Sequence, residues 1–157
     1  MTGIGDLTWD TLESYGFERE ERPEGFVAPL ADITALSSAG IAQLLAHYTE
    51  WANYAAYRLS DAESRQEEAA RGLKVLTNQA ALRATGEKTV AGRRAAASLD
   101  AEVQEAEEEA AQYAALVRSL KMLHENTLRR ASVVSRELSR RQAEAQYVAR
   151  ESKWGAA

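Results

Sequence analysis

Two long stretches of the sequence repeat mostly small and apolar residues at alternating spacings of three and four. This heptad pattern is typical of an α-helix that packs along one stripe against another helix. In the first stretch the repeat falls at Ile41, Leu45, Tyr48, Ala52, Ala55, Leu59, Ala62, Gln66, Ala69, Leu73, Leu76 and Ala80. In the second it falls at Leu99, Val103, Ala106, Ala110, Tyr113, Val117, Leu120, His124, Thr127, Ala131, Val134, Leu138, Arg141, Ala145 and Val148. The alternation is unbroken in both, which predicts two long helices with a left-handed supercoil.

A glycine-containing break separates the two stretches. Gly86 and Gly92 lie close together, and glycine raises the cost of continuing a helix. Either Ser37 or Ser38 can cap the start of the first helix. The predicted segments are a helix over 37–84, a turn over 85–93 and a helix over 94–153. Because a short turn between two heptad helices favours antiparallel packing, we predict an all-α, coiled-coil-like helical hairpin over residues 37–157.

The composition agrees with long helices and excludes several other classes. Alanine supplies roughly a fifth of the chain, and only two prolines and nine glycines interrupt it, which argues against a β-sandwich, a barrel or a Rossmann sheet. The chain has no cysteine, so it carries no disulfide scaffold, zinc ribbon or thiol nucleophile. No apolar run approaches the length that spans a bilayer, and we expect a cytoplasmic protein without membrane contact.

Residues 1–36 form a separate acidic and aromatic arm. Pro23 and Pro29 bias their preceding residues away from helix, so most of the arm reads as extended. Residues 7–15 can form one short helix. Aromatic residues in such an arm indicate docking, either on the chain's own helices or on a neighbouring subunit, and the sequence leaves both open.

The alanine-rich seam predicts that the hairpin is not stable alone. Alanine buries little apolar area, and two helices have no third layer to cover the further apolar residues. We therefore expect a homo-oligomer, or a larger host assembly, that buries this second stripe. The residues expected at the oligomer interface are Trp9, Phe17, Phe26, Trp51, Tyr54, Leu116, Leu120, Leu123, Leu128, Val134 and Leu138.

Charge is distributed unevenly along the chain. Residues 1–50 hold nine acidic and two basic residues, whereas residues 118–157 hold four acidic and nine basic residues. Such asymmetry is typical of a polyanion-binding end, but also of acidic ends that pack on basic ends of other copies. The cations considered for phosphate contact are Lys88, Arg93 and Arg94 at the hairpin tip, and Arg129, Arg130, Arg136, Arg140 and Arg141 on the second helix. Salt bridges to Glu125, Glu137, Glu144 and the acidic arm are the alternative use of these arginines.

Motifs that carry chemistry are weak in this chain. His124 lies on the second seam without another histidine four residues on, so it fits a register-setting core position better than a zinc site. His47 shows no metal-ligand spacing. The 86–89 segment, Gly-Glu-Lys-Thr, lacks the spacing of a phosphate-binding loop, and the glutamates of 105–109 fit a solvated face. We predict no catalytic residues, no metal and no cofactor, and hence a protein that is not an enzyme.

The layout resembles the bacteriophage recombination mediators of the UvsY-like family. The resemblance covers about residues 40–140. It rests on the 47–51 segment (His-Tyr-Thr-Glu-Trp), the 87–90 segment (Glu-Lys-Thr-Val) with Asp100 shortly after, and the 131–136 segment (Ala-Ser-Val-Val-Ser-Arg). It implies a homo-oligomer that binds single-stranded DNA and helps to load a RecA-like recombinase. It also adds two cations to the expected DNA contacts, Arg83 and Lys74.

Two functions follow as hypotheses. The first is a phage recombination mediator in the cytoplasm of the infected bacterial host. The second is a virion structural protein of the head, neck or decoration type, which packs through its arm and hairpin against other virion proteins without binding DNA. Salt-dependent binding of oligonucleotides distinguishes them.

Overall fold

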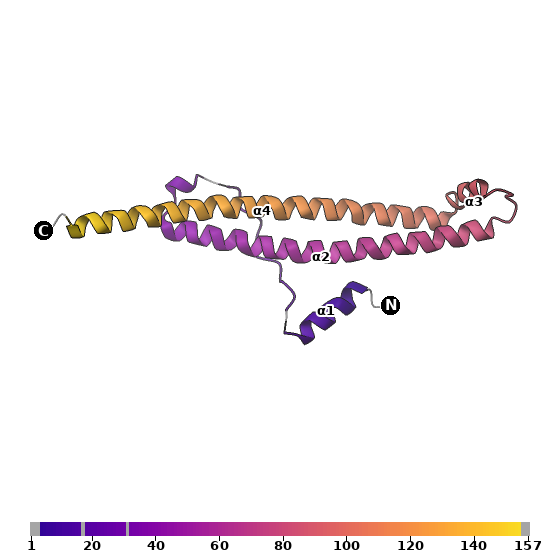
Figure 1. Ribbon diagram of the computed structural model, residues 1–157, viewed down its shortest axis with the longest axis horizontal. Helices are drawn as coiled ribbons and strands as arrows, with labels where there is room; N and C mark the ends of the chain where they lie inside the picture. Colours follow the sequence, from indigo (N-terminus) through magenta and orange to yellow (C-terminus); the bar gives the residue numbers. More distant parts are fainter. Residues whose placement is uncertain (1–3, 17, 31, 155–157) are drawn as a thin grey trace. The chain divides into compact units, whose positions relative to one another are not determined.

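The computed structural model describes residues 4–16, 18–30 and 32–154, and every regular element in this part of the chain is helical (Figure 1). The elements are α1 (Ile4–Ser14), the 3-10 helix η1 (Ile33–Ala35), α2 (Ser38–Arg83), α3 (Val90–Ala97) and α4 (Ala101–Trp154). The chain forms two compact units. The tip unit consists of residues 1–19 and 57–121, and the arm unit consists of residues 20–56 and 122–157. The predicted all-helical fold with a long helix pair is confirmed.

The start of α2 is capped as the sequence predicts. The Ser37 hydroxyl accepts a hydrogen bond from the Gly40 amide at 3.1 Å, and the Ser37 carbonyl accepts from the Ile41 amide at 2.9 Å. These bonds satisfy amide groups that have no partner inside the first helical turn. The sequence also predicts a short helix over residues 7–15, and this helix is α1, which spans Ile4–Ser14.

The predicted turn over 85–93 is correct only up to residue 89, and the predicted start of the second helix at Arg94 is wrong, since residues 90–97 form a separate helix. Helix α3 occupies this region, because the Thr89 hydroxyl accepts from the Gly92 amide at 3.0 Å and caps a new helix. The chain leaves that helix at Ser98, and Asp100 caps α4 by accepting from the Glu102 amide at 3.0 Å. The Asp100 cap thus begins α4 inside the segment that the heptad pattern predicts as one continuous helix. Leu99 lies just before this cap and is 77% exposed, so it is not a seam residue.

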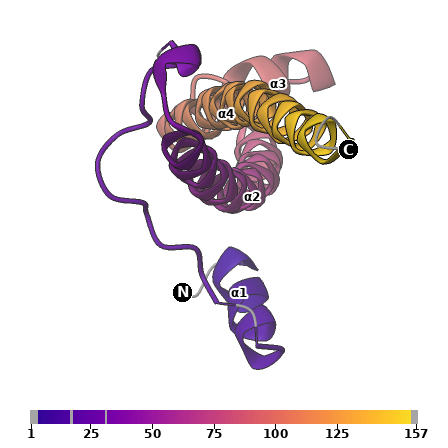
Figure 2. The same ribbon diagram turned by 90° about the vertical axis from the view of Figure 1, so that its left-hand side faces the viewer.

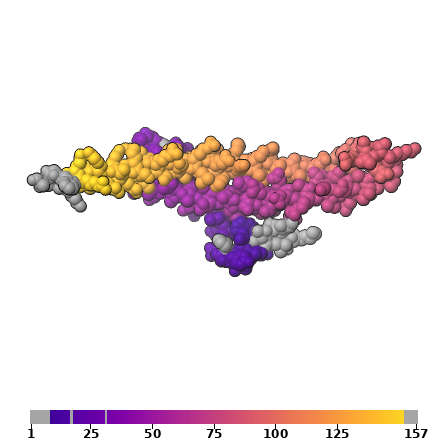
Figure 3. Space-filling model, in the orientation of Figure 1, coloured from indigo at the N-terminus to yellow at the C-terminus, as the bar shows by residue number. Residues whose placement is uncertain are grey.

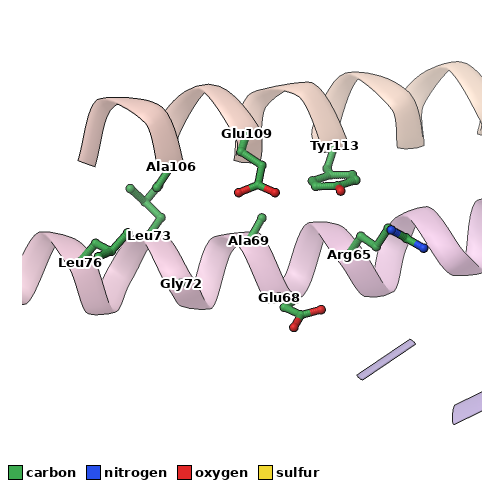
Figure 4. A pocket seen from close by; sticks show the side chains of 9 residues that line it. All are labelled: Arg65, Glu68, Ala69, Gly72, Leu73, Leu76, Ala106, Glu109 and Tyr113. Carbon is green, nitrogen blue, oxygen red and sulfur yellow. The ribbon is translucent and has the colours of Figure 1, made fainter. Parts of the chain in front are cut away.

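In the tip unit, the first core lies where α2, α3 and the start of α4 meet. Ala80, Ala97 and Val103 are buried there, with Leu73 and Leu76 packed against them. Further along the same unit, Figure 4 shows Leu73 beside Ala106, while Arg65 lies near Tyr113. Residue numbers rise along α2 as they fall along α4, so the two helices run antiparallel in this unit.

In the arm unit, the core combines both long helices with the arm. Ile41, Tyr48 and Val134 are fully buried, and Val27, Ile33 and Leu36 of the arm pack against them together with Leu44, Leu45, Ala131 and Leu138. Figure 2 shows the arm segment alongside one edge of the helix pair before α2 begins. The arm therefore supplies a third layer to this unit, and of the two kinds of docking that the sequence left open it shows the one on its own chain.

The predicted seams account for most of the burial. All twelve seam positions of α2 are buried or half-buried, and so are the α4 positions from Val103 to Arg141. Ala145 and Val148 are exposed. Arg141 already bonds the carbonyl of Leu36, which precedes α2, so the residues beyond it have no α2 seam to face.

No helix in the described residues is both long enough and apolar enough to cross a membrane.

Candidate functional site

The arm is held on its own chain by two arginines of α4. The Arg141 guanidinium donates to the carbonyl oxygens of Leu36 at 2.6 Å, Thr34 at 3.1 Å and Ile33 at 3.1 Å. Arg130 donates to the carbonyl oxygen of Ala28 at 3.0 Å. We call these contacts the arginine clamp. Charged donors make the stronger protein hydrogen bonds, so the clamp fixes the arm in cis, which the sequence left open.

Two side chains of α2 complete the docking at Ala28. The Ala28 amide donates to His47 Nε2 at 3.2 Å, and the Tyr48 hydroxyl donates to the Ala28 carbonyl at 3.1 Å. Burial raises the pKa of the Tyr48 phenol, since a buried phenolate loses its hydration. These contacts give His47 a structural role in the arm unit, as an acceptor for an arm amide.

One turn before Arg141 on α4, the Glu137 carboxylate bonds two arginines. Glu137 accepts from Arg140 Nη2 at 2.8 Å and from Arg141 Nε at 2.7 Å, and Arg140 also pairs with Glu144. Hydrogen bonds from Arg140 and Arg141 lower the pKa of Glu137 to about 2. The same hydrogen bond to Glu137 raises the pKa of Arg140.

These contacts decide how several of the predicted phosphate ligands are used. Arg130, Arg140 and Arg141 bond carbonyls or carboxylates of their own chain, as the salt-bridge alternative expects for Arg140 and Arg141. Arg129 and Arg136 are exposed on α4. In the tip unit, Arg83 pairs with Glu102 at 3.1 Å, and the Arg93 Nε donates to the Glu87 carbonyl at 3.0 Å.

The aromatic residues expected at an oligomer interface are mostly covered within the chain. Trp51 is only 7% exposed and lies among His47 and Tyr54, with the Arg22 guanidinium 5.9 Å from its ring centre. Its indole nitrogen has no hydrogen-bond partner among the described residues. In the tip unit, Trp9 packs edge-to-face on Tyr57 at 4.7 Å.

The remaining predicted interface residues fall into three groups. Val134 is fully buried and Leu120 and Leu138 are half-buried, so all three belong to the seam of the single chain. Leu116, Leu123 and Leu128 are each at least two-fifths exposed. Phe26 is 84% exposed, and Phe17 lies outside the described residues.

An apolar groove of about 400 Å³ runs along the edge of the arm unit that the arm does not cover. We call it the open edge; its lining residues are Ala42, Leu45, Ala46, Thr49, Glu50, Asn53 and Leu138. The arm contacts His47 and Trp51, which share one face of α2. Ala42, Ala46, Thr49 and Asn53 repeat at helical spacing on a different face. In the arm unit, the arm therefore covers one edge of the helix pair and leaves the other edge uncovered.

A second groove, of about 530 Å³, lies in the tip unit between the end of α2 and α3. We call it the tip groove; Thr77, Asn78, Ala81, Leu82, Val90, Arg93 and Arg94 line it. Leu82 is 75% exposed and Val90 is 70% exposed. Lys74, one turn before Asn78 on the same face of α2, and Lys88, just before α3, are also exposed. Figure 3 shows the outer surface of this end of the tip unit in pink. In the tip groove, Arg93 and Arg94 thus lie beside apolar side chains.

A third cavity, of about 340 Å³, interrupts the seam of the tip unit (Figure 4). It forms because Ala69, Gly72 and Ala106 are too small to fill the space between α2 and α4. Hydrogen bonds to Tyr113 and Asp61 raise the pKa of Arg65 at one end. No group of three potential metal-ligating side chains occurs in the described part of the chain.

Comparisons with protein-family models, with curated proteins and with solved structures each found no match. The resemblance to UvsY-like mediators therefore stays a prediction from the sequence.

Proposed function

We propose that this protein is a non-enzymatic assembly protein, whose hairpins associate with further copies of the chain along the open edge of the arm unit. The observation that carries the proposal is the asymmetry of that unit. The arm and its arginine clamp cover one edge, whereas the other presents a shallow apolar groove.

The side chains of the open edge suit a second helix. Ala42, Ala46 and Thr49 are small, so the backbone of a neighbouring helix can approach closely. Leu128 of α4 is 47% exposed in the same unit. Its apolar surface gains roughly 25 cal/mol for each Å² that a second copy removes from water.

The use of the arginines supports assembly over nucleic-acid binding in the arm unit. Arg130, Arg140 and Arg141 are engaged with acceptors of the same chain. A phosphate would have to displace those acceptors, and releasing the Arg141 contacts would also loosen the arm.

The test places a charge at the open edge. Ala46→Lys introduces an ammonium group into the groove, while Gln43→Lys puts the same group on the exposed face of the same helix. Sedimentation equilibrium at high salt should show association of wild type and Gln43→Lys but a single-chain mass for Ala46→Lys. Helical circular dichroism checks that all three fold alike. Equal masses for Ala46→Lys and wild type would exclude the open edge as the interface.

Binding of single-stranded DNA and recombinase loading form a second candidate, favoured by the cations of the tip. Lys74, Lys88 and Arg94 are exposed there, and Arg93 lines the same groove. Fluorescence anisotropy with a labelled oligonucleotide tests it at two salt concentrations. Binding that weakens steeply with salt supports a phosphate-contacting tip, provided that Arg93→Gln with Arg94→Gln reduces the slope. Absence of binding at low salt removes this candidate.

A further inference from the structure

Phe26 is displayed on an anchored bend of the arm unit. Its side chain is 84% exposed, the largest exposed fraction among the large apolar residues of the described chain. Gly25 adopts a left-handed conformation with φ of 77°, which favours glycine and turns the chain just before Phe26. Arg22 donates to the Gly25 carbonyl at 3.4 Å and lies over the ring of buried Trp51. The aromatic ring is thus held outward by contacts that reach the core of its unit.

Acidic residues precede Phe26 in the chain. Glu20, Glu21 and Glu24 are all exposed, and we call residues 20–26 the acidic knob. An exposed phenylalanine side chain is less favourable in water than a buried one. A large apolar side chain inside a negatively charged segment is suited to an apolar hollow with a positive rim.

The tip groove has these two properties. Leu82, Val90 and Ala81 provide an apolar lining, and its volume of about 530 Å³ lies in the range of sites that take a large side chain or a small ligand. Arg93 and Arg94 line the same groove. Lys88 is exposed just before α3 and adds to the positive charge at this end.

We propose that Phe26 of one copy inserts into the tip groove of a second copy, with the knob glutamates facing Arg93, Arg94 and Lys88. This inference rests on the proposed assembly function and names a second contact for it, distinct from the open edge. Knob and groove are different surfaces, so the contact is heterologous. Each added copy brings a free knob and a free groove, and the assembly grows head to tail until a ring closes.

The contact is tested in the Ala46→Lys background, where association along the open edge is removed. Two further variants each disable one partner surface: Phe26→Ser removes the knob ring, and Arg93→Glu with Arg94→Glu reverses the groove charge. At low salt, the chain that carries Ala46→Lys alone should grow into higher-mass species as its concentration rises. Each further variant alone should stay at the mass of one chain, because each retains only one working surface.

Mixing the two variants gives the decisive result. The knob variant still has a groove and the groove variant still has a knob, so the mixture should form a one-to-one heterodimer and nothing larger. Phe26→Ser should weaken the contact roughly thirtyfold, as expected for an aromatic anchor, and salt should weaken it further.

Three results would overturn the inference. The first is a mixture that stays monomeric although both variants show wild-type helicity. The second is growth that persists in either variant alone. The third is a background chain that stays monomeric at all concentrations, as it would if the knob were bound within its own chain. A failure of the proposed open-edge interface is detected separately, because the Ala46→Lys chain and wild type would then have equal masses at high salt.

Discussion

Replacing Arg141 with methionine should loosen the arm and lower the stability of the chain. Methionine keeps an unbranched apolar stem but removes the donors to the carbonyls of Ile33, Thr34 and Leu36. Hydrogen bonds to a charged group contribute about 1.5–3 kcal/mol each. Water can replace part of this, because the Arg141 side chain is one-fifth exposed and the released carbonyls lie on a surface segment.

We therefore expect Arg141→Met to reduce the free energy of unfolding by about 2–4 kcal/mol. For a chain of this size that corresponds to a fall in Tm of roughly 4–16 °C. Urea unfolding followed by circular dichroism measures the free energy. Hydrogen exchange at the Ala28 amide, which bonds His47, measures release of the arm.

Two variants separate the clamp from a general effect of charge. Arg141→Lys keeps the charge, but a single ammonium group cannot reproduce the planar fork that contacts several carbonyls, so it should retain little of the stability. Arg136→Met removes an exposed arginine of the same helix and should change the free energy by less than about 0.5 kcal/mol. If Arg141→Met were as stable as Arg136→Met, with unchanged exchange at Ala28, the clamp would not hold the arm.

Three further changes follow from the structure. Gly72→Ala should raise the free energy of unfolding in urea by about 0.5–1 kcal/mol, because Gly72 lies inside α2 and an added Cβ meets no atom within 4 Å. A loss of stability would mean that the cavity beside Gly72 is not open. Trp51→Phe should cost much less than the 3–5 kcal/mol expected for Trp51→Ala, because phenylalanine leaves a smaller cavity and the indole N–H that it removes has no hydrogen-bond partner among the described residues. Equal costs would mean that the indole makes contacts that a phenyl ring cannot replace. In the folded chain the pKa of Glu137 is lowered from 4.5 to about 2, so Glu137 contributes stability above pH 4.5 that is lost as the pH falls towards 2. Glu137→Gln should therefore flatten the dependence of Tm on pH between about 4.5 and 2. An unchanged slope would contradict the stabilising role of the Glu137 carboxylate.

The heptad spacing predicted the two long helices and their contact stripes because burial repeats along a helix with a fixed period. Ser37 gave the start of α2 for an equally local reason, since a cap needs only a hydroxyl close to a free amide. The break between the helices was predicted less well. Thr89 and Asp100 cap two separate helices, and a glycine pattern does not indicate that both caps are used.

The candidate sites depended on long-range contacts and were harder to predict. Arg141 bonds carbonyls more than a hundred residues earlier in the sequence, and nothing in the local pattern identifies those acceptors. One signal was present, since Arg141 falls on a mostly apolar seam, where a charge needs a partner. The tip groove depends on α3, whose residues were predicted to lie partly in the turn over 85–93 and partly in the helix over 94–153. Its cations were identified, whereas the apolar surface of Leu82 and Val90 beside them was not.

The mass of the full-length chain in solution tests the proposed function most directly. Sedimentation equilibrium should be run from micromolar to near-millimolar concentration, at low and at high salt. The assembly account predicts a mass of two or more chains at both salt concentrations, because the open edge is apolar, with still larger species only at low salt, where charges assist the knob. A mass of one chain throughout, with full helicity, would contradict it.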